Sequence, residues 1–190
     1  RHYGAKILSR RPESLAGDKS PDIEWIVHTL KELGGLGRAP DCFSILRPTS
    51  PCRKAATIRR AWAQFLEERS VDSLRAVELC AQHPGKMWIV RGRRMHPLTP
   101  MTPDGATPFH STQYAALPKV YVQNASLEIA WSRVALDGGT IAGDVLTPFL
   151  TEGDEGLDVN SPADWRLLEM MVADGSASLP PVGAAPYPDI

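Results

Sequence analysis

The stretch "DCFSILRPTSPCRKAATIRRAWAQFLEE", residues 41–68, decides the fold because two structural patterns meet in it. Its first part, "DCFSIL", is a short apolar run suited to a buried β-strand. "RPTSPCR" follows as a loop. Its last part predicts an amphipathic helix, since one face collects the apolar residues Ile58, Ala61, Trp62, Phe65 and Leu66. The stretch therefore predicts strand, loop and helix in succession.

The segments on either side continue this alternation. "SPDIEWIVHTLKELGG", residues 20–35, predicts a helix that Ser20 caps and that Gly34-Gly35 ends. "DSLRAVEL", residues 72–79, is typical of another strand, and "HYGAKIL" near the start predicts a helix end that turns into a strand. Helices alternating with apolar strands indicate an α/β domain with a mainly parallel sheet.

The second half of the chain departs from this alternation. Residues 83–98, "HPGKMWIVRGRRMHPL", predict a β-hairpin around Arg91-Gly92, and the Pro-, Thr- and Gly-rich residues 99–118 predict a long loop or extended arm. Strand character returns at 119–131, with an expected turn at Asn124, and again near 145–150. We therefore expect one domain over residues 1–172, an arm inserted at 83–118 and an irregular tail at 173–190.

Composition limits the possible classes of protein. The chain has 190 residues, enough for one sizeable core, and a formal net charge of −1, which gives no overall attraction to nucleic acid or acidic membranes. No apolar run approaches the roughly 20 residues that cross a bilayer. The odd number of cysteines, Cys42, Cys52 and Cys80, is typical of reduced thiols in a cytoplasmic protein.

The stretch "EGLDVNSPADW", residues 155–165, is the first candidate for chemistry. Leu157 and Val159 alternate with Asp158 and Asn160, which predicts a short strand that projects both oxygen-bearing side chains one way. A helix then begins, with Ser161 as its cap. Asp158 and Asn160 suit Mg²⁺, which takes one or two carboxylates plus water and substrate oxygens. The alternative is ordinary helix-start geometry with solvated polar groups.

Two further segments are candidates for binding. In "RPTSPCR", Thr49, Ser50 and Arg53 lie between a strand and a helix start and suit an anion or a nucleotide. The alternative is a plain turn with a capping serine. In "HPGKMW", Lys86 suits a phosphate or a carboxylate, and the alternative is a solvated surface lysine.

The order of "HYGAKILSRRPESLAGDKSPD", "ILRPTSPCRKAATI", "HPGKMW", "LPKVYVQNAS" and "EGLDVNSPADW" resembles the acylneuraminate cytidylyltransferase family, over residues 1–171. The resemblance implies a Rossmann-like three-layer α/β fold with a β-hairpin dimerisation arm. It also implies that CTP is joined to a nine-carbon α-keto acid sugar, releasing pyrophosphate, with Mg²⁺ as cofactor and a homodimer as the assembly.

The resemblance also assigns roles to residues. It implies nucleotide binding by Arg47, Thr49, Ser50 and Arg53. It implies sugar binding by Lys86, Gln113, Tyr114 and Asn124. Asp158 and Asn160 fall on the family's metal-binding and catalytic positions.

Members of the family begin with a strand and a Gly/Ser/Lys/Arg-rich loop for the CTP phosphates, and this chain starts after that segment. We therefore expect the chain by itself to be inactive. Two alternatives remain open. Arg47, Tyr114 and Asn160 favour a sugar nucleotidyltransferase with another nucleotide or sugar. The absent loop and the lost charges favour a non-catalytic dimeric relative.

Overall fold

A computed structural model describes residues 2–99 and 107–185. Their contacts divide the chain into two units, and each is described by itself. The first unit comprises residues 1–76 and 124–190, and the second comprises residues 77–123.

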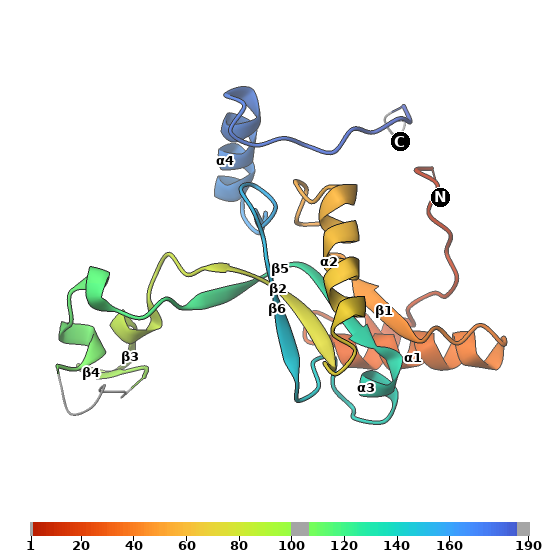
Figure 1. The fold of residues 1–190 in the computed structure, drawn as a ribbon, viewed down its shortest axis with the longest axis horizontal. Coiled ribbons are helices and arrows are strands. Elements are labelled where there is room, and N and C mark those ends of the chain that lie inside the picture. Colours follow the sequence, from red (N-terminus) through yellow and green to blue (C-terminus); the bar gives the residue numbers. More distant parts are fainter. Residues whose placement is uncertain (1, 100–106, 186–190) are drawn as a thin grey trace. The chain divides into compact units, whose positions relative to one another are not determined.

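The first unit contains four α-helices among its described residues (Figure 1). They are α1 (Asp22–Gly35), α2 (Ala55–Glu67), the short α3 (Ser132–Leu136) and α4 (Pro162–Ala173), preceded by the single 3-10 turn η1 (Glu13–Leu15). The predicted helices α1, α2 and α4 are confirmed, but Ser20 does not cap α1, since Pro21 is the residue before it and no side chain caps its start. No helix in the described part of the chain is long and apolar enough to cross a membrane.

The sheet has the strand order β1-β5-β2-β6, which differs from the prediction. Its strands are β1 (Cys42–Ile45), β5 (Tyr121–Trp131), β2 (Ser73–Leu79) and β6 (Leu146–Leu150). β1 pairs with β5 in antiparallel register, with Cys42 opposite Trp131 and Ile45 opposite Glu128. The prediction of a mainly parallel, Rossmann-like sheet is therefore wrong.

The long β5 strand explains the difference. The N–H of Trp131 donates to the carbonyl of Asp72 (3.2 Å), and the N–H of Cys80 donates to that of Val120 (2.8 Å), so β2 and β5 also run in opposite directions. β1 and β2, joined through α2, have the common direction expected of a strand–helix–strand unit. β5 lies between them and is antiparallel to both, which local sequence patterns cannot reveal.

Apolar side chains cover both faces of the sheet in the first unit. On one face, Phe65 and Ala61 of α2 pack against the cluster of Val71, Leu74, Ala76, Leu127, Ile129 and Phe149. On the other face, Ile26 and Leu30 of α1 pack with Ile45 and Ala135. Glu128 lies opposite Ile45 in the register and so belongs to the α1 face.

Three local predictions are also corrected. Residues 157–160 form no strand, although Leu157 and Val159 do pack inward, against Cys52 and Leu168. Residues 5–12 form neither helix nor strand. β5 continues through Asn124, where we expected a turn. Alternating apolar residues at 157–160 do not suffice for a strand there, whereas β5 passes through Asn124 as part of the sheet.

The second unit contains the predicted hairpin. β3 (Trp88–Arg91) pairs antiparallel with β4 (Arg94–Pro97), and Gly92 adopts φ +61° in the turn between them. Single 3-10 turns flank the hairpin: η2 (Pro84–Lys86), η4 (Phe109–Ser111) and η5 (Tyr114–Ala116). A role in dimerisation remains a prediction.

Candidate functional site

The two segments predicted to carry chemistry meet in the first unit. The N–H of Val159 donates to the carbonyl of Thr49 at 2.8 Å, which joins the loop after β1 to the segment before α4. Below this contact, Leu157 and Val159 pack with Cys52, Leu168 and Ala177. Asp158 lies between Leu157 and Val159 and is half-buried, whereas Asn160 is exposed.

Asp158 has an uncompensated oxygen. Its Oδ2 accepts a hydrogen bond from the Asn160 amide at 2.6 Å, whereas its Oδ1 is buried and has no hydrogen-bond partner among the described residues. A buried carboxylate oxygen without a partner carries a desolvation penalty. Such an atom is suited to a cation or to a donor from a ligand.

The start of α4 fixes the backbone on the other side of Asn160. The Asp164 carboxylate accepts from the N–H groups of Asn160 (3.1 Å) and Ser161 (2.8 Å), and the Ser161 hydroxyl accepts from the N–H of Asp164 (3.3 Å). These bonds form a capping box, and they confirm Ser161 as the predicted cap of the helix. The hydrogen bond from the Ser161 side chain, then that from the Asn160 backbone, lowers the pKa of Asp164.

The loop of residues 47–53 is held in shape by the side chain of Arg53. The Arg53 guanidinium donates to the carbonyls of Arg47 (3.1 Å) and Ser126, and burial lowers its pKa. Thr49 is half-buried, and the buried Ser50 hydroxyl has no hydrogen-bond partner in the described part of the chain. Ser50 does not cap α2, since that helix begins at Ala55.

Arg47 belongs to a row of alternating charges on the α1 face of the sheet. Its guanidinium pairs with Asp22, the first residue of α1, and with Glu128 of β5 at 3.5 Å. Glu128 also pairs with Arg75 of β2, and both of these side chains are about nine-tenths buried. The hydrogen bond from Arg47 lowers the pKa of Asp22. Arg47 is thus occupied by acids of its own chain.

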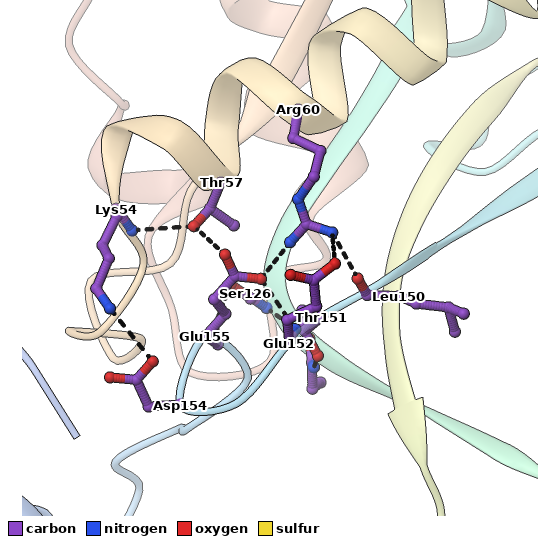
Figure 2. A network of polar contacts seen from close by, with 10 residues as sticks. Lys54, Thr57, Arg60, Ser126, Leu150, Thr151, Glu152, Asp154 and Glu155 are labelled. Carbon is purple, nitrogen blue, oxygen red and sulfur yellow. Dashed lines mark hydrogen bonds and ion pairs between the residues drawn. The ribbon is translucent and has the colours of Figure 1, made fainter. Parts of the chain in front are cut away.

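A second network fixes the turn that leads to Asp158 (Figure 2). The Glu155 carboxylate accepts from the Thr57 hydroxyl (2.5 Å), from the N–H of Glu152 (2.9 Å) and from the Arg60 guanidinium. Its backbone carbonyl accepts from the Ser126 hydroxyl at 2.9 Å. Burial acts to raise the pKa of Glu155, but the bonds from Thr57, Glu152 and Arg60 outweigh it and lower that pKa.

Asn124 lies at the edge of this network. Its side chain is buried, and its amide donates to the Thr151 hydroxyl at 2.8 Å while its oxygen accepts from the N–H of Ser126 at 3.2 Å. The side chain thus joins β5 to the end of β6, and its proposed contact with a sugar stays a prediction.

The other three predicted sugar-binding residues, Lys86, Gln113 and Tyr114, belong to the second unit. Lys86 donates to the carbonyls of His110 (3.0 Å) and Thr112 (2.5 Å). The Tyr114 hydroxyl donates to the carbonyl of Ala81 at 2.7 Å and accepts from the N–H of His83 at 3.0 Å. Gln113 is exposed.

Sequence reasoning missed Glu155, Arg60, Glu128 and Arg75. A signal existed for the last pair, because Arg75 in "SLRAVEL" and Glu128 in "SLEIAW" are opposite charges that each lie between apolar residues of a strand. No comparable signal marks Glu155, whose donors come from positions about 30 and 100 residues away.

Comparison with known proteins adds one finding. No protein-family model matches the chain. The chain is similar to a CMP-sugar synthase. The relative is the CMP-N,N'-diacetyllegionaminic acid synthase of Legionella pneumophila, with 26% identity over 176 residues, covering 90% of this chain and 70% of the relative.

Proposed function

We propose that this protein is a cytidylyltransferase that joins CTP to an acidic nine-carbon α-keto sugar and releases pyrophosphate. The similarity to a CMP-sugar synthase extends over nearly the whole chain and supports the reaction class. The observation that carries the proposal is the bond from Val159 to Thr49, which brings the candidate nucleotide loop beside Asp158.

The residues present fit a weakly held Mg²⁺. The described residues contain no group of three or more His, Cys, Asp or Glu side chains placed to hold a metal. Asp158 offers an unpartnered carboxylate oxygen and Asn160 an amide oxygen, which is a set that Mg²⁺ uses when phosphates and water supply its other ligands. When bound, Mg²⁺ offsets negative charge on a triphosphate.

The residues of the nucleotide loop have two different proposed roles, one structural and one in binding. Arg47 and Arg53 are engaged within the chain and hold the loop in shape. The Ser50 hydroxyl and the Thr49 side chain are the groups left to contact a nucleotide. Within the second unit, Lys86 and Tyr114 hold the segment around Gln113, and we propose that Gln113 contacts the sugar and that the active form is a homodimer.

The three unpaired cysteine thiols fit a reducing compartment, and we propose a cytoplasmic site of action.

A pyrophosphate-release screen of the full-length protein tests the proposal. CTP, UTP, ATP and GTP are each combined with acidic nine-carbon sugars and with neutral sugars, in the presence of Mg²⁺. We expect release only with CTP and an acidic sugar. Release with another nucleotide or a neutral sugar would favour the alternative nucleotidyltransferase, and no release with any pair would favour a non-catalytic protein.

A further inference from the structure

The turn between β6 and Asp158 is tied to the rest of the unit through the carboxylate of Glu155. Residues 152–157 form two consecutive turns, in which the N–H of Glu155 donates to the carbonyl of Glu152 and the N–H of Leu157 to that of Asp154, both at 3.1 Å. Asp154, which pairs with Lys54 at 3.5 Å, and Glu155 both lie where the turns overlap. The Glu155 side chain points at α2, and the Glu155 carbonyl accepts a hydrogen bond from the Ser126 hydroxyl of β5 (Figure 2).

The donors to Glu155 come from rigid parts of the unit. Thr57 lies in the first turn of α2 and is 1% exposed, and Ser126 lies in β5 and is fully buried. Arg60, one helical turn after Thr57, stacks over the Phe149 ring at 4.4 Å, so its guanidinium is also held in place. Glu155 therefore ties the turn to a helix and a strand at once.

Asp158 lies three residues after Glu155, and the backbone is held a second time at the next residue, Val159. Upstream, Glu155 sets the turn, and downstream the N–H of Val159 is bound to Thr49. Between these two anchors Asp158 keeps one buried oxygen without a partner. A side chain can keep such an atom only where the surrounding structure prevents its relaxation.

We propose that Glu155 is a positioning residue that holds Asp158 ready for the metal-bound nucleotide. The inference rests on the proposed function. Residues that orient metal ligands from behind typically change metal affinity or activity by about 10–100-fold when they are replaced. Glu155 also couples α2, which follows the nucleotide loop, to the metal-binding segment, so nucleotide and metal should bind cooperatively through it.

CTP binding measured by calorimetry, once with Mg²⁺ and once with EDTA, tests the inference without relying on turnover. The ratio of the two affinities reports how strongly Mg²⁺ promotes CTP binding. In Glu155→Ala we expect this ratio to fall by about tenfold, while the affinity in EDTA stays within twofold. In Glu155→Gln, which keeps the bond to Thr57, the ratio should fall by less. Hydrogen exchange at the Val159 amide should be faster in Glu155→Ala than in the wild-type protein.

Glu152→Ala is the matched control. Glu152 is an acid of the same turn that also pairs with Arg60, at 2.9 Å, but its side chain is 75% exposed. It should keep the wild-type ratio. An unchanged ratio in Glu155→Ala, or a loss of CTP binding in EDTA as well, would overturn the positioning role alone. A wild-type protein that binds no CTP in either condition would overturn the proposed function itself.

Discussion

At the scale of single residues, Asp158 is the position where stability and function should oppose each other. Its buried Oδ1 lacks a partner, so removing the carboxylate removes a desolvation penalty. We expect Asp158→Ala to keep or raise the melting temperature while lowering Mg²⁺-dependent pyrophosphate release by about 100-fold. Differential scanning calorimetry measures the melting temperature, and a Mg²⁺ titration of turnover measures the loss of pyrophosphate release. Normal turnover at limiting Mg²⁺ would remove Asp158 from the metal site.

Replacing Asn160 tests the opposite change, the addition of a carboxylate beside Asp158. Its amide donates to Asp158 at 2.6 Å, and Asn160→Asp would place two carboxylates there. Like charges repel, but a divalent cation relieves that repulsion. We therefore expect Asn160→Asp to lower the melting temperature without Mg²⁺ and to reduce the Mg²⁺ concentration needed for half-maximal turnover. An increase in that concentration would contradict the assignment.

Glu128 and Arg75 carry a prediction about stability. They form a buried ion pair on the α1 face, and Glu128 also holds Arg47. Breaking such a pair from one side typically costs about 3–5 kcal/mol because the other charge stays buried. We expect this loss for Glu128→Ala in urea unfolding, and near-complete recovery in a Glu128→Leu/Arg75→Met double variant. A loss below about 1 kcal/mol for the single change would show that Arg75 finds another partner.

At the scale of elements, the start of α4 is defined by its capping box. The Ser161 hydroxyl accepts from the N–H of Asp164, and an alanine at such a cap costs about 1 kcal/mol. For a chain of this length, that corresponds to a fall in melting temperature of roughly 2–4 °C in Ser161→Ala. Glu169→Ala, an exposed change on the same helix, is the control and should leave it unchanged. Equal melting temperatures would mean that α4 does not unfold together with the core.

The elements also show which features a sequence can predict. Caps and apolar stripes are local, so α1, α2 and α4 were predicted with nearly correct ends. Strand neighbours are not local: β5 lies between β1 and β2 although more than 40 residues separate it from β2, and this reversed the predicted sheet type. Asp158 and Thr49 were each singled out by sequence, but the bond that joins their segments depends on tertiary packing.

At the scale of the whole molecule, the second unit exposes many apolar side chains. Met87, Trp88, Ile89, Val90 and Met95 are all at least one-third exposed on or beside the hairpin. Apolar side chains exposed in this number favour an interaction surface in this unit. The resemblance to a dimeric family makes a second copy of the chain the expected partner, in a twofold arrangement.

Trp88→Asp tests that assembly. Trp88 lies on β3 with its ring centroid 4.9 Å from that of His110, and a buried carboxylate in a subunit interface is strongly unfavourable. We expect the variant to sediment as a monomer and to lose turnover together with the dimer. Arg93→Ala, in the turn of the same hairpin, changes a polar side chain and should leave the dimer intact. Because Gln113, the proposed sugar contact, belongs to the same unit as this hairpin, loss of turnover without loss of CTP binding would further indicate that the partner subunit completes the sugar side of each site. A Trp88→Asp protein that remains dimeric would place the subunit interface elsewhere.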